Sequence, residues 1–247
     1  MFGMSDPNQT LLQLESYVKD GRLEMAEVMA TQFTDMFLSQ NKRDFTSQIL
    51  LVKGLRILCD VLLLRGKSSI ATASAKILIR ERKKLVSMAK QSPNISPKMI
   101  GTISEDYRRC ANVFANANKH RAAKKFFSKS EKSSPGNIAV AIEAFTHYNH
   151  DKNIIKRLIK CAISAGPVIR ANNTYILQPI DLPSVSAEKV RLALIEISNQ
   201  GFEQANQLAE QIASQIGSIE RGEAAANARL QTALDSLKPK HDYYEYS

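Results

Sequence analysis

The chain has 247 residues, 44% of them hydrophobic, and a formal net charge of +10. This length suits one large domain, or one domain with an appendage. No apolar run reaches the roughly 18 residues that a membrane-spanning helix needs. The N-terminus also lacks the basic-then-apolar layout of a secretory signal. We therefore expect a protein that is cytoplasmic or assembled in a particle, with no signal peptide and no transmembrane segment.

The positive charge is unevenly distributed. Residues 1–185 contain 28 Lys and Arg against 15 Asp and Glu, whereas residues 186–247 contain 6 against 9. This asymmetry predicts a basic body followed by a mildly acidic appendage. A basic body is able to bind nucleic acid, an anionic membrane or an acidic protein, and charge alone does not choose among them.

Apolar residues recur at helical spacing along most of the chain, with breaks at glycine, proline and polar clusters. The breaks delimit predicted helices over 7–20, 22–39, 45–65, 70–90, 97–117, 119–133, 138–150 and 152–165. We assign residues 1–166 to a helical body and 167–186, which contain three prolines, to an extended linker. Residues 187–237 are predicted to form an amphipathic helical arm, of one helix or two, and 238–247 a loosely ordered tail.

Two adjacent helix pairs match each other at an offset of 34 residues. At this offset Phe114 aligns with Tyr148, Asn118 with Lys152, Ala123 with Arg157, Phe127 with Cys161 and Ser130 with Ser164. Two earlier pairs show related spacing, through Leu14, Tyr17, Gly21, Ala26, Ala30 and Phe33, and through Leu62, Gly66, Ala71, Ala75 and Leu78.

In these residues the chain resembles the tetratricopeptide repeat family. The family's pattern of aromatic, small, turn and closing-proline positions falls here on Tyr107, Ala111, Phe114, Asn118, Ala123, Phe127, Ser130 and Pro135, with Tyr148 opening the next match. The resemblance covers about residues 7–165, best at 104–164. It implies an all-α fold in which helix pairs stack into a short solenoid, followed here by the long arm. Arg157 departs from the family's alanine and the chain has no tryptophan, so an irregular helical bundle is the alternative.

Basic residues form two stripes at helical spacing. Arg121, Lys125, Lys129 and Lys132 lie on one predicted helix face, and Lys152, Lys156 and Lys160 on another. If the helices stack one repeat apart, the two stripes form a basic ridge. We interpret the ridge as a docking surface for an acidic partner or a phosphate backbone, with a merely solvated face as the alternative.

In the predicted arm, apolar residues step by threes and fours with an average near 3.6, which is typical of a straight amphipathic helix. The large ones are Leu208, Ile212, Ile216, Ile219, Leu230 and Leu234. The stripe is narrow, so we expect it to pack against other copies or a partner. Folding back onto the chain's own body is the alternative.

Residues with catalytic or ligating chemistry are sparse. The four histidines have no metal-ligand spacing, and we interpret Cys59, Cys110 and Cys161 as small buried hydrophobic residues. No phosphate-binding loop, dinucleotide fingerprint or nucleophile elbow occurs. We therefore expect no catalytic residue, no cofactor and no metal.

The sequence predicts a non-enzymatic structural or adaptor subunit of a larger assembly, for example a virion or a secretion machine. It would bind other proteins, including copies of itself, through the basic surface and the arm. Two alternatives stay open: a protein that binds nucleic acid through the basic ridge, and a chaperone that holds a partner's peptide.

Overall fold

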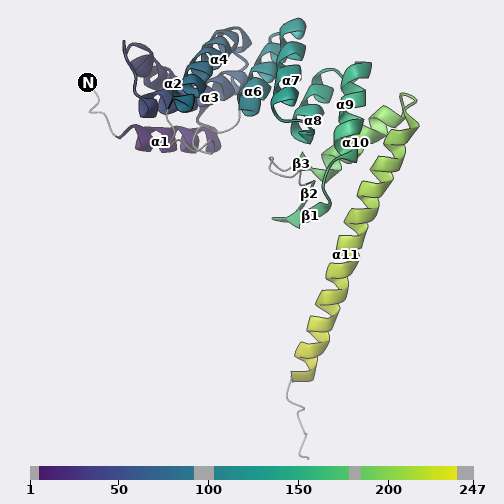
Figure 1. Ribbon diagram of the computed structural model, residues 1–247. Coiled ribbons are helices and arrows are strands. Elements are labelled where there is room, and N and C mark those ends of the chain that lie inside the picture. Colours follow the sequence, from purple (N-terminus) through teal and green to yellow (C-terminus); the bar gives the residue numbers. More distant parts are fainter. Residues whose placement is uncertain (1–5, 92–102, 178–184, 238–247) are drawn as a thin grey trace, which may run out of the picture. The chain divides into compact units, whose positions relative to one another are not determined.

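The computed structural model describes residues 6–91, 103–177 and 185–237, and side chains as far as residue 233. This part of the chain contains ten helices and one small sheet (Figure 1). The predicted all-helical fold is thereby confirmed, with the sheet as an addition. The chain divides into two compact units, Met1–Tyr148 and Asn149–Ser247.

Unit 1 consists of helices joined by short turns. Its helices are α1 (Pro7–Lys19), α2 (Leu23–Leu38), α3 (Phe45–Leu64), α4 (Ser68–Lys90), α6 (Ile103–Asn116), α7 (His120–Ser133) and α8 (Ile138–His147). Asp6, Asp44 and Asn137 cap the starts of α1, α3 and α8, because each side chain accepts a hydrogen bond from the helix's first backbone amides. The predicted start of the helix 97–117 lies outside the described residues.

Three of the helix-to-helix turns have the same hydrogen-bond pattern. At the end of α1, Arg22 N–H donates to the Tyr17 carbonyl at 2.8 Å and Gly21 N–H to that of Val18 at 3.2 Å. The same two bonds occur around Gly66 at the end of α3 and around Asn118 at the end of α6. Gly21, Gly66 and Asn118 all have positive φ, of 73°, 70° and 56°. These are Schellman motifs, which close a helix through one left-handed residue.

The second helix of each pair then approaches its neighbours through small residues. Ala26, Ala71 and Ala123 stand at the same distance after the three turns and are fully buried. Ala30 and Ala75 are buried one turn later, where the third pair has the buried Phe127. Small side chains at these points allow close contact between the paired helices.

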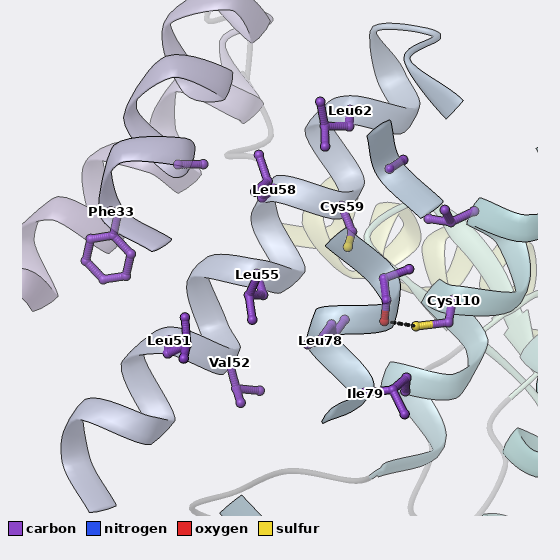
Figure 2. Close-up of a cluster of buried hydrophobic side chains, with 14 of the residues drawn as sticks. Phe33, Leu51, Val52, Leu55, Leu58, Cys59, Leu62, Leu78, Ile79 and Cys110 are labelled. Carbon is purple, nitrogen blue, oxygen red and sulfur yellow. Dashed lines mark hydrogen bonds between the residues drawn. The ribbon is translucent and has the colours of Figure 1, made fainter. Parts of the chain in front are cut away.

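The core of unit 1 is a continuous apolar cluster centred on α3 and α4 (Figure 2). Leu51, Leu55, Leu62 and Leu78 are all at most 2% exposed. Cys59 and Cys110 belong to this cluster as free thiols, and burial raises the pKa of both well above the ordinary range. Cys161 is also free and buried. Their predicted role as small buried residues agrees with this placement.

Buried charges link the helices of unit 1 as well. Asp106, on α6, is fully buried. Its carboxylate forms ion pairs with Arg56 of α3, at an N···O distance of 2.6 Å, and with Arg82 of α4, at 3.2 Å. Glu81 of α4 is equally buried and pairs with Arg43 at 2.8 Å. Such pairs hold helix positions in register, since each buried carboxylate is stable only with its partners in place.

Unit 2 combines helices with the small sheet. It contains α9 (Lys152–Ile163), β1 (Val168–Ala171), β2 (Thr174–Leu177), β3 (Val185–Ser186), α10 (Ala187–Ser198) and α11 (Glu203–Leu237). The strands run antiparallel in the order β1-β2-β3, with Val168 opposite Leu177 and Leu177 opposite Val185. The sheet packs on α10 and α11 through the buried Val168, Leu177 and Val185.

The sheet occupies the range that we predicted as an extended linker. Asn172 and Asn173 join β1 to β2 with φ of 48° and 60°, the two left-handed residues of a tight hairpin turn. The division of the chain also differs from the predicted boundary after residue 166, because α9 belongs to unit 2. Helices α10 and α11 are separate, and Gly201 breaks the arm with a φ of 90°.

Candidate interaction surfaces

The basic stripe of α7 is on the surface of unit 1. Arg121, Lys125 and Lys132 are exposed, and within the described part of the chain none of them forms an ion pair. Lys129 is half-buried, with its ammonium 5.6 Å and 5.5 Å from the ring centres of Tyr107 and Phe126. Three of the four predicted cations therefore face solvent, and the fourth rests on aromatic rings.

The fold does not require positive charge at these positions. Counted from the turn residue, Arg121, Lys125 and Lys132 of α7 correspond to Glu24, Val28 and Asp35 of α2. The corresponding residues of α4 are Ser69, Ala73 and Arg80. The same outer helix positions therefore change from acidic to strongly basic along unit 1.

This concentration of charge disfavours the helix that carries it. Like charges four residues apart destabilise a helix by about 0.2–0.5 kcal/mol per pair. The first turn of α7 also has no acidic residue, and Lys119 at its N-cap makes no side-chain capping bond. Cations near a helix N-terminus oppose the helix dipole. A stripe that lowers the stability of its own helix points to a role outside folding.

The second predicted stripe lies on α9, in unit 2. Lys152, Lys156 and Lys160 are exposed, while Ile154, Ile155 and Leu158 on the opposite face are buried. The seven residues of the predicted ridge are therefore divided between the two units. That the two stripes are neighbours in space stays a prediction.

The residues expected to pack the repeats take different positions. Ala111, Phe114, Ala123 and Phe127 are buried, and Tyr107 and Tyr148 are half-buried. Pro135 is exposed, because it stands in the turn after α7 and marks the end of the helix rather than packing. Phe126, which the repeat pattern does not include, also packs here, with its ring centre 5.2 Å from that of Phe114 in a stacked arrangement.

A polar network joins α6 to α8 and was not predicted. Arg108 pairs with Glu143, and the Asn112 amide donates to the other oxygen of Glu143 at 2.5 Å. His147 lies 3.2 Å from the Asn112 amide oxygen, and burial lowers the pKa of His147. The sequence signal that could have indicated this network is the 34-residue repeat, because it places α6 beside α8. The network fixes these helices to each other.

The predicted arm is only partly free. In α11, Ala205, Ala209 and Ile212 are buried against the rest of unit 2, and Leu208, Ile216 and Ile219 are half-buried. Leu230 is 59% exposed, and the side chain of Leu234 lies outside the described residues. The first half of the arm thus packs within its own unit, mainly on α10 and β1. The alternative interpretation, folding back onto the helical body, stays a prediction.

The β1–β2 hairpin covers the middle of α11. Val168 N–H donates to the Gln215 side chain at 2.8 Å, the Tyr175 hydroxyl donates to Glu220 at 3.1 Å, and Arg170 pairs with Glu223. From Ala224 to Ala233 every described side chain is exposed. In Figure 1 this half of α11 extends well past the sheet and α10.

The apolar stripe of α11 also fits a second period. Ala205, Ala209 and Ile212 are buried and Ile216, Ile219 and Glu223 are half-buried, a set spaced by alternating steps of four and three, with Leu208 half-buried beside it. The same steps continue as a seam through Ala226, Leu230 and Ala233, which are exposed. A period of 3.5 is that of a coiled-coil seam, whereas the prediction was a straight helix of period 3.6.

The described residues contain neither a metal-binding cluster nor a membrane-spanning helix. No cluster of three or more His, Cys, Asp or Glu side chains suited to a metal ion is present among them. None of the helices described is both long enough and apolar enough to cross a bilayer.

Comparison with known proteins identifies a fold and no family. No protein-family model and no curated protein matches the sequence. The solved structure of BtubC (BKLC) from P. vanneervenii is similar, with a TM-score of 0.53 and 11% identity over 94% of this chain and 82% of that one. A protein from Bacteroides ovatus ATCC 8483 matches at a TM-score of 0.34 and 14% identity, over 88% of this chain and 99% of that one. That score is too low to indicate a common fold. The likeness to BtubC supports a helical architecture.

Proposed function

We propose that this protein is a non-enzymatic structural or adaptor subunit of a larger protein assembly, such as a virion or a secretion machine. In this account the second half of α11 pairs with the same segment of other copies. Unit 1 remains available to bind a partner through the basic face of α7. The protein requires no cofactor for this role.

The uncovered half of α11 is the observation that carries the proposal. The seam of period 3.5 continues through Ala226, Leu230 and Ala233, where the described residues of unit 2 no longer cover it. In proteins most helical stability comes from packing of an apolar face rather than from intrinsic propensity. A second helix packed on the seam would stabilise this segment by burying Leu230.

We further propose that unit 1 is a repeat array of the tetratricopeptide type. The three identical turns and the buried alanines that follow them support this assignment, as does the stacking of aromatic residues between α6 and α7. In this account the array serves as a rigid platform whose exposed positions vary without affecting its packing.

Two variants at leucines of similar surface exposure test the assembly role. Leu230→Gln alters the uncovered seam, and Leu192→Gln alters a leucine of α10 with a similar exposure, 55% against 59%. We expect Leu230→Gln alone to lower the mass in solution, measured by light scattering after size exclusion. Equal masses for both variants and the parent would overturn the proposal, and a parent that is monomeric would favour a chaperone-like binding role.

A further inference from the structure

We infer that the outer surface of α4 and α7 in unit 1 binds the phosphate backbone of double-stranded nucleic acid. The inference gives a partner to the basic face in the proposed function, but does not depend on assembly through α11. It rests on which basic residues the structure exposes together, and on what surrounds them.

Helices α4 and α7 both carry exposed basic residues and are in contact near their starts. They are the second helices of successive pairs, and the Lys119 ammonium donates to the Thr72 hydroxyl at 3.1 Å, so the start of α7 lies beside the first part of α4. The exposed cations on these two helices are Lys76, Arg80, Lys83, Lys84, Lys90, Arg121, Lys124, Lys125 and Lys132. The surface is therefore larger than the α7 stripe alone.

Acidic residues hardly interrupt this surface. Glu81 is the single acidic residue of α4 and is fully buried, where it pairs with Arg80 and Lys84 at 2.8 Å and 3.1 Å. Glu131 is the single one of α7 and is half-buried. A surface with one sign of charge and almost no interspersed opposite charge matches a polyanion of uniform charge, such as a phosphodiester backbone.

The surface also lacks the anchors of a protein interface. Protein interfaces are depleted in lysine and depend on a few apolar or aromatic side chains that enter pockets. Among the described residues, the large exposed hydrophobic side chains include none from α7 and only Ile70, in the first turn of α4. Interfaces with nucleic acid are more polar and much more positively charged. Composition therefore favours nucleic acid over an acidic protein.

Double strands suit the surface better than single strands. Single-stranded nucleic acid is held by exposed aromatic rings on which the bases stack. The aromatic residues of α7 are Phe126, which is half-buried and stacked on Phe114, and Phe127, which is 2% exposed. The exposed α7 cations Arg121, Lys125 and Lys132 lie along about 16 Å of helix at the usual rise of 1.5 Å per residue. This arrangement contacts phosphates without reading bases.

A matched pair of triple variants tests the inference on the full-length protein. R121Q/K125Q/K132Q removes three exposed charges from α7, and K152Q/K156Q/K160Q removes three exposed charges from α9. Both variants have the same net charge. The probe is a fluorescently labelled DNA duplex of mixed sequence, with binding followed by anisotropy from low to moderate salt.

We expect the α7 variant to weaken binding at least tenfold and to reduce the slope of log affinity against log salt by about 2–3, since each phosphate contact contributes about 0.9. The α9 variant should bind within about twofold of the parent. Equal losses in both variants would overturn the inference, because binding would then follow net charge. So would a parent that binds polyglutamate but not the duplex, which would indicate an acidic protein. The mass of the protein in solution, measured on the same samples, distinguishes a failure to bind DNA from a failure to assemble through α11.

Discussion

Gly66 and Asn118 hold the same left-handed backbone conformation at the same point of two turns, with φ of 70° and 56°. At both positions the following N–H, of Lys67 or Lys119, closes the helix by donating to a carbonyl five residues earlier, at 2.8 Å. The left-handed conformation costs an ordinary residue roughly 1–2 kcal/mol, less for asparagine and almost nothing for glycine. The turn at Asn118 is therefore more strained than those at Gly21 and Gly66.

Asn118→Gly should relieve this strain. We expect it to raise the free energy of unfolding by up to about 1 kcal/mol, whereas Ala73→Gly, in the exposed interior of α4, should lower it by about 1 kcal/mol. Urea denaturation monitored by circular dichroism measures both. Loss of stability in Asn118→Gly would show that the asparagine side chain contributes more than its backbone conformation costs.

Gly54 is required for the contact of α3 with α2. A Cβ atom at this position would lie 2.6 Å from Phe33 Cδ1 and 3.2 Å from Thr34 Cγ2. Overpacking of this kind typically costs 1–3 kcal/mol, so we expect Gly54→Ala to lower the midpoint of urea denaturation. The control is Gly222→Ala, where an added Cβ meets nothing within 4 Å. It should preserve or increase the helical signal.

Asp106 pairs with the buried Arg82 and the half-buried Arg56. Asp106→Asn would leave Arg56 and Arg82 without their carboxylate, and breaking a buried pair by removing one partner costs about 3–5 kcal/mol. Asp60→Asn is the matched control, because Asp60 pairs with Arg109 at 2.8 Å but is 40% exposed. Its loss should cost no more than about 1 kcal/mol. Equal costs would show that the Asp106 network adds nothing beyond a surface pair.

Glu81 should make unit 1 sensitive to acid. Burial on its own would raise the pKa of Glu81, but hydrogen bonds from Gln48, Lys84 and Arg80 outweigh it, and the pKa lies below its ordinary value of 4.5. A pKa lowered by folding adds stability that is present above the unfolded value and is lost as pH falls through the folded one. In Glu81→Gln, the loss of unfolding free energy below about pH 5 should therefore become shallower. Glu15→Gln, at an exposed glutamate of α1, should retain the parent's pH dependence.

The sequence predicted most of unit 1 because its turns are local. Gly21, Gly66 and Asn118 stand just after apolar-periodic stretches, where a left-handed residue ends a helix. The alanines that follow each turn stand at a fixed spacing from it, which is visible in the sequence without knowing which helices pack together. The hairpin of unit 2 also had a local signal, two asparagines between short apolar segments. The prolines around it favoured the prediction of a linker instead.

Contacts between residues far apart in the sequence could not be predicted from helical periodicity. A helical stripe shows which residues share a face, but not whether a neighbour covers that face, so the division of α11 into a covered and an uncovered half was not predictable. The offset of 34 residues likewise placed Lys125 and Lys156 in successive repeats, without showing that the chain divides between Tyr148 and Asn149. The buried pairs of Asp106 join residues about 25 to 50 positions apart, which no local spacing reveals.

Assembly through the uncovered half of α11 is tested most directly by the mass of the protein in solution. The comparison is between the full chain and a chain that ends at Ala224, which retains the Arg170–Glu223 pair and the covered part of the helix. Both are measured by light scattering after size exclusion, at low and high salt. We expect a defined oligomer of the full chain that survives high salt, and a folded monomer of the shortened chain. The same mass for both would contradict the account.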